Sequence, residues 1–393
     1  MRASVWAGAL TLLAVGAGTG VAGAAPAAPL PAYAPRDLGT LGGTTSEATG
    51  ISGNTVVGNS FLKGDTSEHA FVYSLRTGHM TDIGTLGGDD SQAVAVRGVH
   101  VIGTSELPGG ATHGFVYDLR THHMTDLGTL GGTSSDATAI SGENIVGTSS
   151  LAGDTTSHAF VYSLRTGHLT DLGTLTGSTG SSAGVDISGA TVVGNSPVPD
   201  PAGGSTLHGF AVNLNTHHMT DVGTLGGTFA RVYAVSGHTV VGQSRTGGGA
   251  LDGFAYNVAT HARTDLGPGL KVSPLVSGTT AVGGDSLLSF TYDLTTGATA
   301  MVGPGSGVTQ AFGIDSHLVV GDVFAANAFA FVYRISDSAF TRLPALGGLN
   351  STAAQANARG VVVGSAALPP PDPYTANGPF HAVAWLPRAQ PVG

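Results

Sequence analysis

The chain has 393 residues and no cysteine, and only 10% of its residues are charged and 6% are aromatic. The absence of cysteine excludes a disulfide framework and a lipid-modified cysteine anchor, so packing alone must stabilise the fold. With 41% hydrophobic residues the chain can bury a sizeable core, which excludes the charged, solvated class of disordered protein. Beyond residue 24, no segment has the length and apolarity that a membrane span requires.

Positive charge is also scarce. Lys and Arg number 15 against 25 Asp and Glu, which gives a formal net charge of −10. Nucleic-acid binding requires a basic surface that neutralises phosphates. The sequence therefore predicts no nucleic-acid partner.

The first 24 residues combine Arg2, an apolar run from Val5 to Val15 and the sequence Ala22-Gly23-Ala24. A basic start, a short apolar run and an A-x-A site are typical of a secretory signal peptide. We expect cleavage after Ala24 and a secreted, extracellular product. The rest of the chain then divides into a short linker (25–33), a single domain (34–388) and a C-terminal tail (389–393).

Glycine is abundant, with 63 residues, and it punctuates an internal repeat. An Asp-(Leu/Ile/Val)-Gly anchor recurs at intervals of 45, 44, 45, 50 and 44 residues, at Asp37, Asp82, Asp126, Asp171, Asp221 and Asp265. Two degenerate copies follow, one after Met301 and one after Arg342. Self-similarity at a period of this length indicates a propeller or a solenoid, and the count predicts eight units in one domain.

Each unit contains four short apolar segments bounded by turn residues, which predicts four β-strands. In the first unit these segments are Glu47–Ser52, Thr55–Asn59, His69–Leu75 and His79–Leu86. Tight turns such as Ser52-Gly53-Asn54 and Arg76-Thr77-Gly78 join them in pairs. We therefore expect each unit to be an antiparallel meander.

The ends of the repeat region predict how the domain closes. The region begins with the fourth segment of a unit, PRDLGTLGG, and ends with the third, FHAVAWLP. Such a chain can complete its last sheet with its own N-terminal strand, through pairing of Arg36–Leu41 with His381–Leu386. The sequence thus predicts an all-β, eight-bladed β-propeller of four-stranded antiparallel blades. A seven-bladed propeller and a β-solenoid are the alternatives, because the region 265–341 is irregular.

The repeat also carries a recognisable motif. The His-Ala-Phe sequences at His69 and His158, the His-Gly-Phe variants at His113 and His208, and the DLGTLGG anchors resemble the HAF-type extracellular repeat family of bacterial secreted proteins. The similarity covers residues 34–387, although units five to seven depart from the motif. The resemblance implies a repeat protein of the cell exterior and brings no catalytic residues with it.

A histidine recurs at the head of the third segment, as His69, His113, His158, His208 and His381. An Asp follows 13 residues later in the first four of these units, and Asp37 would complete the fifth pair. Units six and seven lose both members, which indicates a shared and structural role. If Leu75 pairs with His79, the His and the Asp point to opposite faces of their sheet. We therefore expect each pair to meet between neighbouring blades.

Other polar groups favour structure over chemistry. The adjacent pairs His122-His123 and His217-His218 point to opposite faces of a strand, which disfavours a shared metal ion. Gly64-Asp65-Thr66 and Gly153-Asp154-Thr155 resemble Asp turns rather than calcium loops. The repeated Gly-Gly pairs lack the Lys-Ser/Thr of a nucleotide loop. The sequence predicts no catalytic residue, no cofactor and no metal site.

Function is expected on the face of the ring that carries the variable loops, and at the mouth of the channel. These loops are Phe61–Glu68, Ser196–Leu207 and Ala367–Phe380. We expect a monomeric binding or structural scaffold, with a cell-wall glycan or an extracellular protein as its partner. The alternative is an extracellular hydrolase or lyase with a site at the channel mouth.

Overall fold

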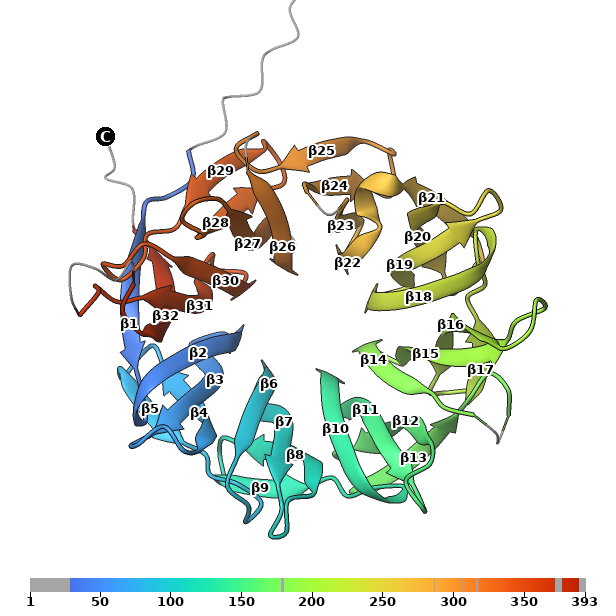
Figure 1. Cartoon of the computed structure of the whole chain (residues 1–393), viewed down its shortest axis with the longest axis horizontal. Coiled ribbons are helices and arrows are strands. Elements are labelled where there is room, and N and C mark those ends of the chain that lie inside the picture. The colour runs from blue at the N-terminus through green and yellow to red at the C-terminus, as the bar shows by residue number, and fades with distance from the viewer. Residues whose placement is uncertain are drawn as a thin grey trace, which may run out of the picture.

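The computed structural model describes residues 29–388, apart from 178–179, 286, 306, 316 and 372–376. The described residues form 32 strands in eight four-stranded antiparallel sheets around a central channel (Figure 1). The predicted eight-bladed propeller is confirmed, and the seven-bladed and solenoid alternatives are wrong. The predicted signal peptide and C-terminal tail lie outside the described residues.

The blades follow one another along the chain, and the first strand of each lies nearest the channel. The strands of blades 1 to 4 are β2 (Gly42–Ser52), β3 (Thr55–Leu62), β4 (Glu68–Ser74), β5 (His79–Asp82), β6 (Ser91–Arg97), β7 (His100–Glu106), β8 (Thr112–Asp118), β9 (His123–Asp126), β10 (Gly131–Ser141), β11 (Asn144–Leu151), β12 (Ser157–Ser163), β13 (His168–Gly173), β14 (Ala183–Ser188), β15 (Thr191–Pro199), β16 (Ser205–Asn213) and β17 (His218–Asp221).

Blades 5 to 8 keep this order, although blade 6 is preceded by a short 3-10 helix. Their elements are β18 (Gly226–Ser236), β19 (Thr239–Thr246), β20 (Leu251–Asn257), β21 (Arg263–Gly267), η1 (Pro268–Leu270), β22 (Val272–Ser277), β23 (Thr280–Gly284), β24 (Ser289–Asp293), β25 (Thr299–Val302), β26 (Val308–Ile314), β27 (Leu318–Phe324), β28 (Phe329–Arg334), β29 (Ala339–Arg342), β30 (Ser351–Ala356), β31 (Val362–Ala367) and β32 (Phe380–Pro387).

The ring closes through the two ends of the chain. Strand β1 (Tyr33–Gly39) is the outermost strand of blade 8 and pairs with β32, with Arg36 opposite Ala384 and Asp37 opposite Val383. The predicted closure is therefore confirmed. Across the same seam, the backbone N–H of Ala382 donates to the Ser46 hydroxyl of blade 1 at 2.8 Å.

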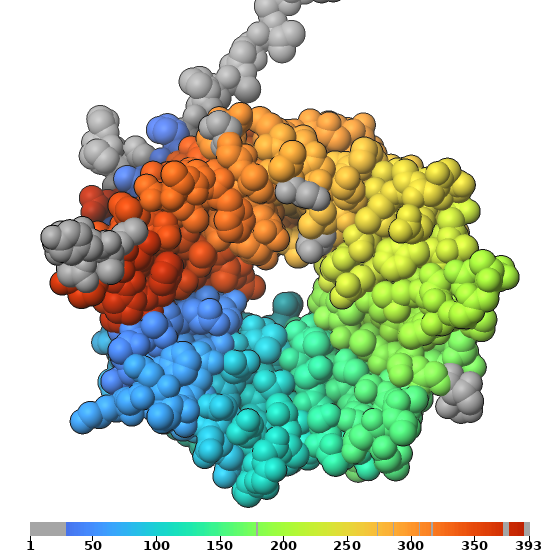
Figure 2. All heavy atoms as spheres, viewed as in Figure 1, coloured from blue at the N-terminus to red at the C-terminus, as the bar shows by residue number. Residues whose placement is uncertain are grey.

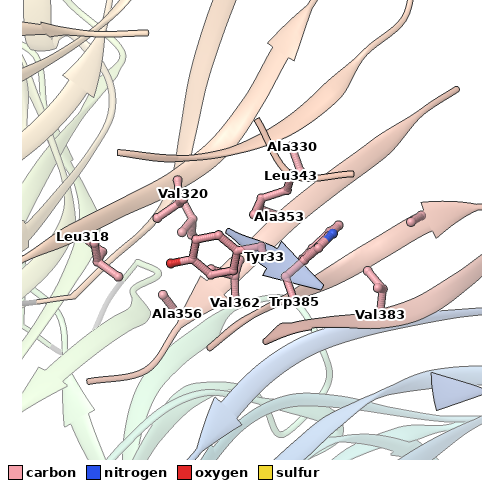
Figure 3. Close-up of a cluster of buried hydrophobic side chains, with 12 residues drawn as sticks. Tyr33, Leu318, Val320, Ala330, Leu343, Ala353, Ala356, Val362, Val383 and Trp385 are labelled. Carbon is pink, nitrogen blue, oxygen red and sulfur yellow. The ribbon is translucent and has the colours of Figure 1, made fainter. Parts of the chain in front are cut away.

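The hydrophobic core lies between neighbouring blades rather than inside any one of them. Figure 3 shows the cluster between blades 7 and 8, in which Tyr33 of β1 and Trp385 of β32 pack against Val320 and Val362. Trp385 is fully buried and donates its indole N–H to the carbonyl oxygen of Pro344 at 2.7 Å. The Trp385 ring is thus part of the closure and is not available to a ligand.

In seven of the eight blades, one glycine of the second strand is required by close packing. In blade 3, a Cβ at Gly147 would lie 1.9 Å from the backbone oxygen of Asp136 and 2.7 Å from the ring of Phe160. Phe160 is fully buried, as are its equivalents in five other blades, Phe71, Phe115, Phe210, Phe254 and Phe331. The repeated Gly and the repeated Phe are therefore two halves of one packing unit.

The DLGTLGG anchor forms two successive turns that link one blade to the next. In the first turn, the carboxylate of Asp82 accepts the backbone N–H of Gly84 at 2.7 Å, and Gly84 has a left-handed φ of 74°. In the second turn, the Thr85 hydroxyl donates to the carbonyl oxygen of Gly88. These turns end β5 at Asp82, four residues before the predicted end of the strand.

Buried serine hydroxyls fasten neighbouring blades together. Ser91 of blade 2 donates to the carbonyl oxygen of Gly84 at 2.7 Å and accepts the N–H of Ala70 in blade 1 at 3.0 Å. The same pair of bonds is made by Ser46, Ser135 and Ser182. Each of these hydroxyls both donates and accepts, so its own hydrogen-bonding groups are satisfied at the junction.

Candidate functional site

The up-and-down order of the strands places the connections on two faces of the ring. We call the side of the first-to-second and third-to-fourth turns the turn face, and the opposite side the loop face. The predicted recognition segments Phe61–Glu68 and Ser196–Leu207 each join a second strand to a third, so they lie on the loop face, as do the described residues of the third segment, 367–371 and 377–380. Figure 2 shows that the ring leaves the central channel open.

Five His–Asp pairs lie at the loop-face ends of the third and fourth strands. In each pair the imidazole Nδ1 lies 2.8–3.0 Å from a carboxylate oxygen, and the pairs are His69–Asp82, His113–Asp126, His158–Asp171, His208–Asp221 and His381–Asp37. The predicted contact between the repeated His and Asp is therefore present, and His381–Asp37 joins the two ends of the chain.

The expectation that these pairs join neighbouring blades is wrong, because His69 and Asp82 belong to the same sheet. The four-residue turn 75–78 pairs Ser74, and not Leu75, with His79. Asp82 then stands opposite Phe71, two residues from His69 and on the same face. A shift of one residue in register moves every side chain of a strand to the other face, which accounts for the error.

Each His–Asp pair, called a dyad below, holds together the loop-face ends of the third and fourth strands of its blade. The Asp carboxylate that accepts the imidazole N–H also accepts the N–H of the Gly two residues later, so it fixes both the His and the turn. His208 meets a second acceptor, since its Nε2 lies 3.0 Å from the carbonyl oxygen of Thr228. With an acceptor at each ring nitrogen, His208 satisfies both contacts only when both nitrogens carry a proton. The hydrogen bond to Asp221 is the main cause that raises the pKa of His208.

Three blades replace the dyad. Blade 5 has Asp252 beside Asp265, and burial together with the neighbouring carboxylate raises the pKa of Asp252. Blade 7 has Phe329 and Arg342, and the guanidinium of Arg342 lies 4.4 Å from the centroid of the Phe329 ring. Blade 6 has Leu288 and Met301 at these positions. We call blades 5 to 7 the divergent arc, and blades 8 and 1 to 4 the regular arc.

Exposed apolar side chains gather on the divergent arc. Among the described residues six large apolar side chains are exposed, and five of them lie on this arc or on the link that leaves it, namely Leu287, Met301, Phe312, Phe324 and Leu349. Leu287 is 62% exposed. Single exposed apolar residues are normal on a protein surface, whereas a contiguous apolar patch marks an interaction site.

Two hollows border blade 7, and the larger of them is lined mostly by blades 8 and 1 of the regular arc. The larger, of about 430 Å³, lies between blades 7, 8 and 1 and is lined by Phe312, Glu47, Thr49, Thr352 and Ser365 among others. The second lies between blades 6 and 7 and includes Val272, Ser289 and Gln310. At the channel-facing position that Phe312 occupies, most other blades carry smaller side chains, such as Thr49 and Thr138.

The buried carboxyl group of Asp322 borders the larger hollow. Burial raises the pKa of Asp322 to about 7, and its Oδ1 accepts the N–H of Ala353 at 3.0 Å. Asn195 occupies the same place in blade 4, where its amide bonds to both the N–H and the carbonyl oxygen of Val232. A protonated Asp322 carries an acceptor and a donor, as the Asn195 side chain does in blade 4. Because the two residues occupy equivalent positions of the repeat, a structural role for Asp322 is favoured.

No known protein family and no curated protein matches this sequence. Among solved structures, the chain is similar to a prolyl endopeptidase, with 12% identity and a TM-score of 0.57 over 84% of this chain and 55% of that one. It is also similar to Porphyromonas gingivalis dipeptidyl peptidase 4, with 8% identity and a TM-score of 0.53 over 84% and 56%. The chain thus spans about half the length of these two proteins.

A third similar structure is the β-propeller domain of the Trilobed protease from Pyrococcus furiosus, with 11% identity and a TM-score of 0.52 over 77% of this chain and 98% of that one. That domain is described as having an open velcro topology, whereas β1 and β32 close the ring here. Identities this low show a shared propeller fold and nothing about activity.

The predicted regions and the observed site overlap only in part. The structure brings each His together with its Asp, but it places exposed apolar groups on blades 6 and 7, which the loop argument did not single out. Units six and seven lose both the His and the Asp, and this loss was the sequence signal that the surface of blades 6 and 7 differs from that of the other blades. Within the described part of the chain, no three His, Asp or Glu side chains converge as metal ligands, and no helix is long and apolar enough to cross a membrane.

Proposed function

We propose that the protein is a secreted binding scaffold in which the regular arc keeps the ring rigid and the divergent arc contacts an extracellular polypeptide. The observation that carries this proposal is the gathering of five of the six exposed large apolar side chains on one sector. Support for the location comes from the signal-peptide features of residues 1–24 and from the resemblance to HAF-type extracellular repeats.

The chemistry of the divergent arc favours a polypeptide that is apolar and acidic. Leucine, methionine and phenylalanine side chains beside an arginine are the composition of the centre of a protein interface. Three basic residues, Arg245, Lys271 and Arg342, lie toward the loop face of these blades. Asp252, Asp265 and Asp285 lie on the same face of blades 5 and 6, so an acidic segment would be directed to the three basic side chains and not to the arc as a whole.

An enzymatic role as a hydrolase or lyase has less support. Asp322 is the group that such a role would first invoke, because a carboxyl with a pKa of about 7 beside a hollow can exchange protons near neutrality. Its side chain is 2% exposed and replaces an asparagine of the repeat. These facts assign the shifted pKa to burial at a blade junction.

The proposal is tested with short synthetic peptides rich in Leu, Phe and Glu, and with matched peptides that carry Lys in place of Glu. A ligand that prefers the folded state raises the melting temperature. We expect the acidic peptides to do so for the wild-type chain. The variant Phe324→Ser with Met301→Ser should lose the effect, and Val94→Ser, which alters an exposed apolar residue in blade 2, should keep it.

The proposal fails if acidic and basic peptides act equally, or if Val94→Ser weakens the effect as much as the paired variant. It also fails if only cell-wall glycans raise the melting temperature. That result would assign the arc and the Phe312 hollow to sugar binding.

A further inference from the structure

The turn face carries a different chemistry from the loop face. Ten of the 15 histidines lie in or beside its short turns, and the other five form the dyads of the loop face. Nine of these ten belong to blades 1 to 5, as His79, His100, His122, His123, His168, His217, His218, His238 and His261. Together with Arg76, Arg97, Arg120 and Arg165 we call them the histidine arc.

Acidic groups are few on the histidine arc, and they are engaged. The carboxylate of Asp118 accepts the backbone and side-chain N–H groups of Arg120, and that side-chain hydrogen bond is the main cause that lowers its pKa to about 2. Glu143 lies 3.9 Å from Arg165. Four arginines against two acidic residues give the arc a formal charge of +2, and protonation of its nine histidines raises the charge to +11.

Further charged groups lie around the arc. His100 Nε2 lies 3.9 Å from the carboxylate of Asp118, which favours positive charge on the arc, whereas neighbouring arginines disfavour it. Arg36 reaches the carbonyl oxygen of Leu75 from β1, and Arg359 of blade 8 lies beside Gly53. On the inner strand of blade 4, Asp186 accepts the N–H groups of two neighbours, and burial raises its pKa to about 6. Its negative charge is therefore lost over the range in which histidines gain theirs.

Three of the histidines occupy backbone positions where glycine is less strained. His122, His217 and His261 have left-handed φ angles of 56°, 55° and 59° at the last turn position before the fourth strand. Blades 1, 3 and 6 have Gly78, Gly167 and Gly297 at the same position. A non-glycine residue in this conformation costs about 1 kcal/mol. All three residues are exposed, and two of the imidazoles also hydrogen-bond to the Tyr hydroxyl behind the turn, His122 to Tyr117 at 3.2 Å and His261 to Tyr256 at 2.6 Å.

We propose that the histidine arc binds an acidic polysaccharide in mildly acidic surroundings and releases it near neutral pH. An anionic membrane would require apolar groups to insert, and the six exposed large apolar side chains of the described residues lie on the loop face or in the channel. Single-stranded nucleic acid would require exposed rings for stacking, whereas Tyr73, Tyr117, Tyr162 and Tyr256 behind the turns are buried. A linear polysaccharide that carries carboxylates requires only a row of cationic side chains on the protein surface to bind.

The test measures binding of the full chain to immobilised polygalacturonate by surface plasmon resonance. We expect binding at about pH 5.5 that is lost at about pH 7.5, and that weakens as salt is added. Replacing His122, His217 and His261 together with Gly should weaken binding at the lower pH about fivefold to tenfold. Thermal stability should change little, because the relief of left-handed strain offsets the hydrogen bonds lost to Tyr117 and Tyr256. The matched control is Ser338→Gly, which changes the equivalent left-handed position in blade 7, outside the arc, and should bind as the wild type does.

Equal binding at the two pH values would overturn the proposal, as would wild-type affinity in the triple-glycine variant. Equal binding to uncharged dextran would also overturn it, because the arc would then not act through charge. Tighter binding to single-stranded DNA or to anionic vesicles than to polygalacturonate would assign the surface to a different partner.

Discussion

Replacing Asp322 with Asn should stabilise the propeller, and the gain should depend on pH. Asp322 is buried, and its folded-state pKa of about 7 lies well above the value of about 3.9 for an unfolded Asp. Because the folded pKa is the higher one, the stability from the protonated form is complete below about pH 4 and is lost as the pH rises through 7. A shift of about three units corresponds to about 4 kcal/mol at alkaline pH, which is an upper bound.

The variant Asp322→Asn removes this charge and supplies an N–H donor for the carbonyl oxygen of Ala353, as Asn195 does toward Val232. We expect the variant to be more stable than the wild type by about 2–4 kcal/mol at about pH 8, with the difference vanishing near pH 4. Urea unfolding followed by fluorescence of the buried Trp385 measures it at each pH.

The converse substitution is the control. Asn195→Asp introduces a carboxyl group at the same position of blade 4 and should destabilise the protein at about pH 8 by a similar amount, but little near pH 4. If the Asp322→Asn difference has the same size at every pH, burial of an ionised Asp322 is not what limits stability. The structural role assigned to this residue would then be wrong.

Further predictions concern the dyads and the packing unit. His158→Ala and Asp171→Ala should each destabilise the chain by about 1–3 kcal/mol, and a double-mutant cycle by urea unfolding should show that the two losses do not add. Gly147→Ala should prevent folding or lower stability by more than about 3 kcal/mol by circular dichroism, whereas Gly142→Ala, in open space with a φ of 58°, should cost only about 1 kcal/mol. An NMR titration of His208 should give a pKa above the ordinary histidine value, and the stability from its dyad should be lost as the pH rises through that pKa.

The architecture was predictable because the same sequence pattern recurs in several units of the repeat. The anchor spacing gives the number of blades, and a chain that starts on a fourth strand and stops on a third has one way to leave no sheet incomplete. A contact between the repeated His and Asp was also predictable, because units six and seven lose both members, although unit five keeps Asp265 without the His. The anchor and the His–Asp pairs recur with the period of the repeat, so each blade gives separate support to the same prediction.

The predictions that were wrong or incomplete depend on a single residue of strand register or on the distances between neighbouring blades. The turn after Ser74 contains four residues, and a shorter turn would have placed His69 and Asp82 on opposite faces. The apolar surface of the divergent arc was missed because Met301 and Phe324 look like core residues in a strand pattern. Only the position of the neighbouring blade shows that these side chains are exposed.

The pairing of β1 with β32 has a consequence for the order of folding. His381 and Asp37 are 344 residues apart, so the earliest strand to be synthesised waits for nearly the whole chain before its partner exists. Blade-by-blade assembly can proceed, but the final cooperative step requires the last residues of the domain. A chain that stops before Phe380 keeps an unsatisfied strand edge at its beginning, which is the kind of edge that recruits other chains into aggregates.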